Sequence, residues 1–371
     1  MPPIPHVYLH IPFCHRICPY CSFYKHQPGG TDIPAFLEAV IQETKLAATK
    51  WGERLAVETI YWGGGTPSML STKHLENFLP KFLNALGNPT PVEWSVEMNP
   101  RSLTPDKLSL LRSCGVTRAS LGVQAWDAAT LKTLGRDHTP AEAAESFAAL
   151  RRASFPVVSM DLMFSIPNQP LDLWMDSLRQ TVALRPDHIS CYNLTYEEDT
   201  QFFERFRSGE YSRDENADET FFTRTEQFLE AAGFLHYETS NYAQPGCQSR
   251  HNSGYWRGAD YLGLGPSAVS TIDRIRTKNV EDTGKYIRLL DNGAPPAGEI
   301  EHLTPQQWIC ERLALELRTA EGVDLSILES TDPSKLEQLE MGGLAKLQDR
   351  KLALINRGKL LVDSIVEFLW T

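Results

Sequence analysis

The sequence predicts an α/β protein built on a partial (β/α)6 barrel, followed by a small C-terminal α+β domain of winged-helix type. Six short segments rich in β-branched and aromatic residues alternate with helix-like segments, which indicates a parallel sheet with right-handed crossovers. Six units are too few for the usual eight-stranded closure, so the barrel is expected to stay open. After an acidic helix-like stretch at Asp218–Ala232 the alternation stops, and the rest of the chain follows other patterns.

The predicted helices begin at residues that favour helix starts. Ser71, Thr104 and Thr139 are candidate N-cap residues, and a proline follows two of them directly. The predicted strands are His6–Ile11, Val57–Trp62, Glu93–Met98, Thr117–Val123, Val157–Met163 and His188–Thr195. The predicted helices between them are Pro34–Lys50, Thr72–Leu86, Pro105–Ser113, Pro140–Arg152 and Leu171–Leu184.

The chain is expected to have three parts: the barrel (1–235), a connecting region rich in glycine and aromatic residues (236–303), and the C-terminal domain (304–371). The C-terminal domain is expected to hold helices and a two-stranded wing. Its last segment, LALINRGKLLVDS, alternates apolar and polar residues around a predicted turn at Arg357-Gly358. The helix-like stretches of this part are Pro305–Leu317, Ser334–Asp349 and Leu352–Thr371.

Composition excludes several classes of protein. A net charge of −11 and a pI near 5.4, with scattered cations, argue against nucleic acid as a main partner. No apolar run approaches the ~18 residues that a membrane-spanning helix needs, and the N-terminal residues lack the pattern of a signal peptide. Three of the seven cysteines fall within eight residues, which indicates metal binding in a reducing compartment. We therefore expect a cytoplasmic protein.

The three close cysteines, Cys14, Cys18 and Cys21, follow the first predicted strand with C-x3-C-x2-C spacing. Thiolates are the usual ligands of iron–sulfur clusters, and three of them leave one iron of a [4Fe–4S] cluster without a protein ligand. That iron could chelate the amino and carboxylate groups of S-adenosylmethionine (SAM), and an electron passed into the sulfonium could then break a carbon–sulfur bond. The alternative is a structural zinc site with His10 or His15 as the fourth ligand, although no second C-x2-C pair exists.

A polar residue or a glycine run lies at the end of each predicted strand. Because the carboxyl ends of parallel strands share one rim, these residues are expected to surround the cysteine loop. The glycine run Gly63-Gly64-Gly65-Thr66 is expected to let the backbone approach a ligand and to offer it amide N–H groups. Each residue also has a structural interpretation when taken alone, as a turn, a solvated strand end or a partner for buried backbone. Besides the glycine run, the rim residues are Cys14, Glu97, Gln124, Asp161 and Thr195.

With these residues assigned, nearly the whole chain resembles the radical SAM family of oxygen-independent coproporphyrinogen III dehydrogenase and its haem-chaperone branch, HemW. The motifs are YLHIPFC, CPYC, WGGGTPS, EMNP, SLGVQ, LGRDH, MDLMFSIPNQ and HNSGYW, in this order. The resemblance implies a [4Fe–4S] cluster on Cys14, Cys18 and Cys21. Arg136 is implied only by the resemblance, since GRDH alone suggests a solvated loop. The implied SAM-binding residues are Tyr8, Tyr20, Gly64, Gly65, Thr66, Glu97, Gln124, Arg136, Asp161 and Thr195.

Three features favour the chaperone branch over the dehydrogenase branch. Dehydrogenases typically carry a fourth cysteine two residues after the third, where this chain has Phe23, and a longer segment before the first cysteine. HNSGYW matches the HNxxYW signature of the chaperone branch, which implies haem binding by His251, Asn252, Tyr255 and Trp256. The surrounding sequence suggests a loop open to a large flat ligand, and imidazole is a common axial ligand of haem iron. The alternative is that the aromatic residues belong to the core and His251 lies in a turn.

The resemblance thus implies a haem chaperone that binds haem as cargo, holds a SAM-ligated cluster and passes haem to an acceptor protein. It also implies an electron donor, and the sequence names neither partner. Two other functions stay open: a coproporphyrinogen III dehydrogenase, and a radical SAM enzyme with an unrelated substrate. Coproporphyrinogen oxidation is expected to be weak or absent, and whether SAM is cleaved is left open.

Overall fold

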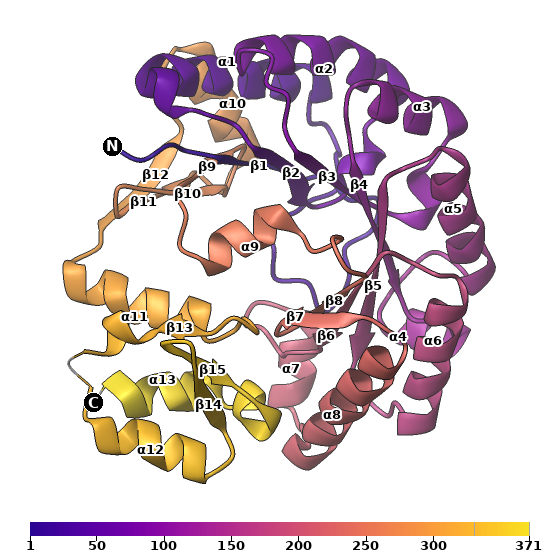
Figure 1. Cartoon of the computed structure of the whole chain (residues 1–371). Helices are drawn as coiled ribbons and strands as arrows, with labels where there is room; N and C mark the ends of the chain where they lie inside the picture. The colour runs from indigo at the N-terminus through magenta and orange to yellow at the C-terminus, as the bar shows by residue number, and fades with distance from the viewer. Residues whose placement is uncertain (330, 371) are drawn as a thin grey trace.

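The computed structural model describes residues 1–329 and 331–370, and its centre is a curved sheet of six parallel strands (Figure 1). These strands pair in chain order, each with the next, as the repeated strand–helix pattern predicted. The partial barrel is therefore confirmed. The strands are β1 (His6–Ile11), β2 (Thr59–Gly64), β3 (Glu93–Met98), β4 (Arg118–Gln124), β5 (Val157–Phe164) and β6 (His188–Asn193).

Helices cover the outer face of this sheet (Figure 1). Ser71, Thr104 and Thr139 cap helices as predicted, since each side chain accepts a hydrogen bond from the backbone N–H three residues later. Thr139 also forms a capping box with Glu142. The helices are α1 (Ile33–Trp51), α2 (Thr72–Ala85), α3 (Pro105–Ser113), α4 (Ala128–Thr133), α5 (Pro140–Arg152) and α6 (Leu171–Ala183), with short 3-10 turns at η1 (Gly52–Arg54), η2 (Pro67–Met69) and η3 (Pro100–Ser102).

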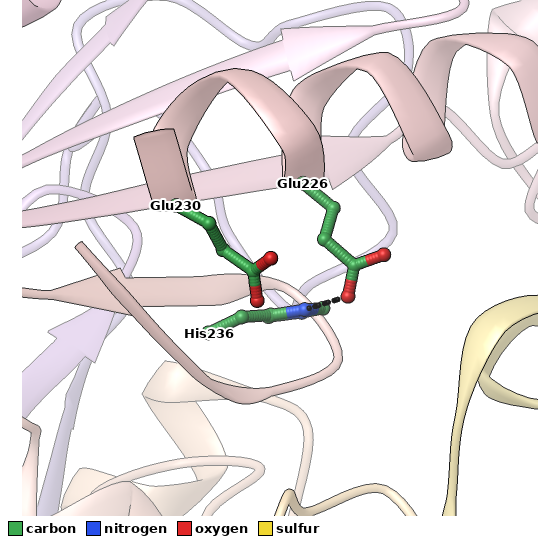
Figure 2. A group of neighbouring side chains, drawn as sticks. All are labelled: Glu226, Glu230 and His236. Atoms are coloured by element: carbon green, nitrogen blue, oxygen red, sulfur yellow. Dashed lines mark hydrogen bonds and ion pairs between the residues drawn. The ribbon is translucent and has the colours of Figure 1, made fainter. Parts of the chain in front are cut away.

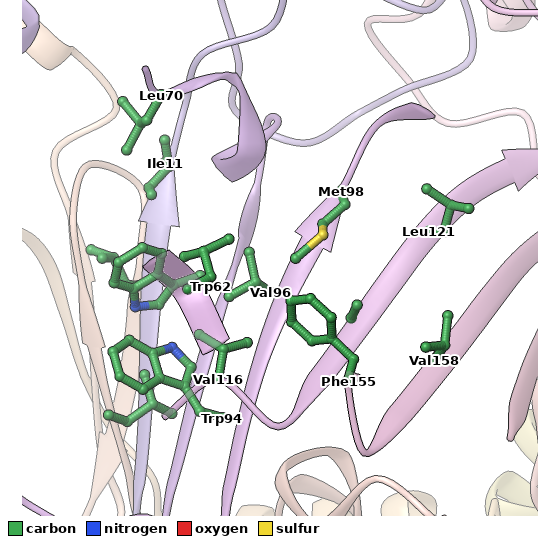
Figure 3. Packing of buried hydrophobic residues seen from close by; sticks show 14 of the residues in the cluster. Ile11, Trp62, Leu70, Trp94, Val96, Met98, Val116, Leu121, Phe155 and Val158 are labelled. Carbon is green, nitrogen blue, oxygen red and sulfur yellow. The ribbon is translucent and has the colours of Figure 1, made fainter. Parts of the chain in front are cut away.

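The main core lies between the sheet and these helices (Figure 3). The rings of Trp62 and Trp94, from neighbouring strands, lie 5.4 Å apart and are fully buried. Phe78 and Phe82 of α2 pack against Trp62. Side chains alternate between the two faces of a strand. Because these aromatic residues face the outer helices, the residues between them on each strand face the barrel interior. The interior positions are polar: Thr59, Tyr61, Ser95, Glu97, Ser120, Ser159 and Asp161.

The region 236–303 extends the central sheet at both edges, and the resulting sheet of the described chain has twelve strands. At one edge β7 (Leu235–Glu238) and β8 (Asn241–Ala243) join β6. At the other edge β9 (Tyr261–Leu264) runs parallel to β1. The remaining elements of this part and of the segment before it are α7 (Gln201–Arg207), α8 (Glu215–Ala231), α9 (Arg250–Trp256), β10 (Val269–Ile272), β11 (Ile275–Asn279), α10 (Thr283–Asp291) and β12 (Ala297–His302).

The segment that carries HNSGYW is helix α9, so the expectation of a loop there is wrong. Figure 1 shows α9 lying across the inside of the curved sheet. Ser249 caps the helix by accepting from the backbone N–H of Asn252. The carboxylate of Glu93 accepts from the backbone N–H groups of Arg250 and His251, which satisfies two more donors at the helix start.

The C-terminal part has its own apolar core, and its hairpin differs from the predicted wing. The turn lies at Asp349-Arg350, both with positive φ, and not at Arg357-Gly358. Gly358 instead packs so closely that a Cβ would lie 1.9 Å from the carbonyl oxygen of Leu344. The predicted helix to Asp349 ends early, at Met341 before Gly342-Gly343. The elements are α11 (Pro305–Glu316), β13 (Val323–Asp324), η4 (Leu325–Leu328), α12 (Pro333–Met341), β14 (Ala345–Gln348), β15 (Lys351–Leu354), η5 (Asn356–Leu360) and α13 (Val362–Trp370).

Candidate functional site

A cavity of about 610 Å³ opens at the carboxyl ends of the parallel strands, and we call it the carboxyl-end cavity. It brings the three cysteines together with nine of the ten residues that the resemblance assigned to SAM. The tenth, Tyr8, lies outside its lining, and the Tyr8 hydroxyl is 3.0 Å from Nδ1 of His10. The nine residues in the lining are Tyr20, Gly64, Gly65, Thr66, Glu97, Gln124, Arg136, Asp161 and Thr195.

The cysteine loop presents three free thiols to this cavity. The Thr66 hydroxyl lies 3.7 Å from Sγ of Cys14, and Nη1 of Arg136 lies 3.5 Å from Sγ of Cys18. Burial raises the pKa of Cys14 to about 11, so thiolates here depend on a bound cation. Donors aimed at two sulfurs suit thiolate ligands of a cluster.

The arrangement does not favour the zinc alternative. A tetrahedral zinc ion with Zn–S bonds of ~2.3 Å holds its thiolates less than ~4 Å apart. Within the described residues, the three cysteine sulfurs do not gather within 4.8 Å of one another. His10 has both ring nitrogens engaged, with the Tyr8 hydroxyl and the carbonyl of Tyr24. The His10 ring is therefore not free to be the fourth ligand of a zinc ion.

The glycine run packs directly against the cysteine loop. A Cβ on Gly65 would lie 2.7 Å from the carbonyl oxygen of Phe13, and one on Gly64 would lie 2.5 Å from the His10 ring. The N–H groups of Gly65 and Thr66 donate to the carbonyls of Ile11 and Phe13. The expectation that these amides are free for a ligand is therefore wrong, because they fasten the run to the loop that carries Cys14.

Two half-buried carboxyl groups, Glu97 of β3 and Asp161 of β5, face the cavity from the barrel interior. Burial raises the pKa of Glu97 to about 7, although hydrogen bonds from the Tyr61 hydroxyl (2.9 Å) and from the N–H of Gly64 oppose this. Burial also raises the pKa of Asp161, whose oxygens accept from Ser120 at 2.9 Å. A cationic ligand such as an amino group would stabilise both carboxylates here.

Arg136 is half-buried at the cavity, contrary to the solvated loop that GRDH alone suggests. Its Nη2 donates to the carbonyl of Gly122 (3.0 Å), and its Nε has no hydrogen-bond partner. Gln124 ends β4 in a left-handed conformation (φ 66°), after a bulge at Gly122. Thr195 lies at the cavity rim, where its hydroxyl donates to Glu197.

Sequence reasoning missed several residues of this cavity, among them Tyr61, Tyr192 and Asn193. Tyr61 lies two residues before Gly63 and therefore on the same face of β2, so strict alternation from the glycine run would have found it. Phe23 also lines the cavity and is 67% exposed, at the position where the dehydrogenase pattern has its fourth cysteine.

The four predicted haem residues do not form one surface. His251 is fully buried inside the barrel, with Nδ1 2.7 Å from Oγ1 of Thr59 and Nε2 2.8 Å from the Tyr255 hydroxyl. Burial lowers the pKa of His251 to about 3, so its imidazole is neutral at physiological pH. Trp256 lines a different cavity, and Asn252 lines neither cavity.

That second cavity, of about 1160 Å³, lies at the amino ends of β1 and β2, and we call it the amino-end cavity. Helix α9 forms part of its wall through Ser253, Gly254 and Trp256, and residues of the C-terminal part form another wall. Gly254 is required by close packing, because a Cβ there would lie 2.1 Å from Nε2 of His6. The motif helix therefore separates the barrel interior from the amino-end cavity.

Within the described residues, one group of side chains has the spacing of metal ligands: Glu226, Glu230 and His236, from α8 and β7 (Figure 2). Glu230 and His236 also line the amino-end cavity. The His236 ring lies 2.9 Å from Glu226. Lys359 of the C-terminal part donates to the same Glu226 oxygen and lies 3.4 Å from Nδ1 of His236. Because the ammonium group already neutralises this carboxylate, we interpret the group as a contact between barrel and C-terminal part.

Among the described helices, none combines the length and apolar character that crossing a membrane requires.

The sequence profile of the radical SAM superfamily matches residues 8–180. The heme chaperone HemW of Mycobacterium tuberculosis is 34% identical over 98% of this chain and 94% of its own length. HemW of Bacillus subtilis is 32% identical over 96% of this chain and 97% of its own. The solved structure of the coproporphyrinogen III oxidase HemN from Escherichia coli covers 100% of this chain and 91% of its own, with a TM-score of 0.84 and 22% identity, which shows a shared fold.

Proposed function

The chain belongs to the HemW family of radical SAM proteins, and from this premise we propose that it binds haem and passes it to an acceptor protein. The observation that carries the proposal is the likeness to heme chaperones of this name over nearly the full length of both chains. The 22% likeness to a coproporphyrinogen III oxidase concerns the fold alone and does not favour that activity. An electron donor and a haem acceptor are further proposed partners, identified only by these roles.

We propose that Cys14, Cys18 and Cys21 hold a [4Fe–4S] cluster and that SAM occupies the carboxyl-end cavity beside it. A cluster bound there would supply an open iron for the amino and carboxylate groups of SAM and an electron for its sulfonium. Glu97 and Asp161 would pair with the cationic part of the ligand, and Arg136 would offset the charge of the thiolates. The reducing cytoplasm is the proposed compartment, since all seven cysteines are free thiols.

We propose that α9 is the haem-binding element and that haem approaches it from the amino-end cavity, where Trp256 lies. His251 can ligate iron only if α9 moves, because both of its nitrogens are hydrogen-bonded and a neutral imidazole has one lone pair to offer. Haem binding by His251 would therefore break the contact with Thr59 or with Tyr255.

Titration of the reconstituted protein with haem, followed at the Soret band, tests this proposal. His251→Ala should weaken haem binding and shift the band while leaving the cluster spectrum unchanged. His188→Ala is the matched control, because His188 is another buried interior histidine with both nitrogens hydrogen-bonded, to Ser159 and Tyr237. Melting temperatures without haem separate lost binding from lost stability. Wild-type haem affinity and spectrum in His251→Ala would remove His251 as a ligand.

Anaerobic assay of the same sample with coproporphyrinogen III, SAM and reductant separates the chaperone from a dehydrogenase. We expect little or no protoporphyrinogen IX. Sustained turnover near the ~1–10³ per second typical of enzymes would contradict the chaperone proposal.

A further inference from the structure

The motif helix α9 lies directly beneath the carboxyl-end cavity and is fastened there by a buried ion pair. Glu93 of β3 accepts from the start of α9, and Arg118 of β4 donates to the same carboxylate at 3.1 Å. Arg118 also donates to the carbonyl of Cys247, just before the helix. These contacts hold the start of α9 against β3 and β4 inside the barrel.

A short series of contacts joins α9 to a carboxyl group of the cavity. The ring of His251 lies 5.2 Å from the ring of Tyr61, with an angle of 30° between the planes. The Tyr61 ring also stacks on the ring of Tyr8, with 6.2 Å between the ring centroids. The Tyr61 hydroxyl donates to Oε1 of Glu97 at 2.9 Å. The orientation of the Glu97 carboxylate thus depends on Tyr61, and the ring of Tyr61 contacts the ring of His251.

Gly63 lets the side chains of Tyr61 and Glu97 pack closely against the backbone of β2. A Cβ on Gly63 would lie 2.9 Å from Oε1 of Glu97 and 3.0 Å from Cε1 of Tyr61, so both side chains already fill the space that a larger residue would need. The pair is therefore packed against backbone, and a shift of the Tyr61 ring must change the hydrogen bond to Glu97.

We propose that Tyr61 is a positioning residue that transmits the state of α9 to the SAM site through Glu97. The inference rests on the proposed function, since it takes Glu97 to hold SAM and α9 to hold haem. Haem binding that drew His251 away from Thr59 or Tyr255 would uncover the face of Tyr61, and Glu97 would lose the orientation that suits SAM. Haem and SAM therefore weaken each other's binding by the same factor, as linkage requires.

The experiment compares Tyr61→Phe with Tyr286→Phe in the cluster-containing protein. Tyr286 also donates from a buried hydroxyl to a buried glutamate, Glu43, at 2.6 Å, but far from α9. The measurement is the SAM concentration that half-completes the change in the electron paramagnetic resonance spectrum of the reduced cluster. Tyr61→Phe should raise it about three- to tenfold, the worth of one ordinary hydrogen bond, and Tyr286→Phe should not.

Two further measurements separate positioning from general stability. On a Glu97→Gln background, Tyr61→Phe should have no additional effect on SAM, because Tyr61 acts only through that carboxylate. Haem should raise the half-saturating SAM concentration of the wild type and have little effect on that of Tyr61→Phe. Equal SAM responses in the wild type and Tyr61→Phe, or equal losses in both tyrosine variants, would overturn the inference.

The proposed function fails in a different way. If the wild type binds no haem, or if SAM does not alter the cluster spectrum, the proposed function is wrong and the inference falls with it. If the wild type binds both ligands and neither changes the affinity for the other, the inference alone is wrong.

Discussion

Nη1 of Arg136 lies 3.5 Å from Sγ of Cys18, so a half-buried cation lies against the middle cysteine of the triad. The same guanidinium holds the carbonyl of Gly122 at the end of β4. Arg136 therefore links the cysteine loop to the end of β4. Its positive charge lies beside the position where a cluster would gain an electron.

Arg136→Met should lower the midpoint potential of the bound cluster. The reduced cluster carries one more negative charge than the oxidised one, and a nearby cation stabilises it. At an effective dielectric constant of ~20 the loss amounts to on the order of 100 mV. A redox titration measures it, with Arg101→Met, half-exposed and paired with acidic groups, as the control. An unchanged potential would show that Arg136 does not act on the cluster.

Replacing Cys14, Cys18 or Cys21 with Ala should abolish the brown chromophore, because two thiolates do not hold a cubane stably. Iron analysis after anaerobic reconstitution should fall from about four per chain to near zero. Cys114→Ala and Cys310→Ala, which change cysteines outside the carboxyl-end cavity, should keep the iron. Retention of about four irons by any triad variant would refute the assignment of that cysteine.

Gly65→Ala should disturb both the cluster and SAM binding, because the added methyl would clash with the backbone of Pro12 and Phe13. Displacing that backbone moves Cys14, and overpacking of this kind costs about 1–3 kcal/mol. Gly30→Ala is the control, since nothing lies within 4 Å of a Cβ there. Iron content and the SAM-induced spectral change should fall in the first variant only, and a normal cluster in Gly65→Ala would contradict the packing argument.

The contact between the barrel and the C-terminal part should depend on pH. Hydrogen bonds from His236 and Lys359 lower the pKa of Glu226 to about 2, so the unfolded chain binds more protons as the pH falls below its ordinary value of 4.5. The stabilisation is therefore complete above about pH 5 and is lost as the pH falls toward 2.

Melting temperatures of the wild type and Lys359→Met check this prediction. The variant should melt about 1–3 °C lower at pH 7, and the difference should shrink as the pH falls from about 5 toward 2. Lys351→Met, which removes a more exposed pair with Glu321, should change the melting temperature little at any pH. A difference that is undiminished at pH 2 would show that the effect is not carried by Glu226.

Much of the fold could be predicted because its signals are local. Strand–helix alternation and the caps at Ser71, Thr104 and Thr139 depend on residues a few positions apart. The residues at the rim of the barrel could then be predicted, because the carboxyl ends of parallel strands lie at the same edge of the sheet. The error in the C-terminal hairpin was also local: apolar alternation continues past the true turn at Asp349-Arg350, and nothing in the pattern marks Gly358 as a packing glycine.

By itself the sequence determined the partial barrel, the cysteine triad and most of the residues around the carboxyl-end cavity. Only the tertiary structure decided that Arg136 packs against Cys18, that HNSGYW forms a helix inside the barrel, and that the His251 ring contacts Tyr61. The difference has one physical cause. Elements and rims follow from side-chain periodicity along the chain, whereas α9 owes its place to Glu93 and Thr59, more than 150 residues away in sequence, and no short pattern encodes that packing.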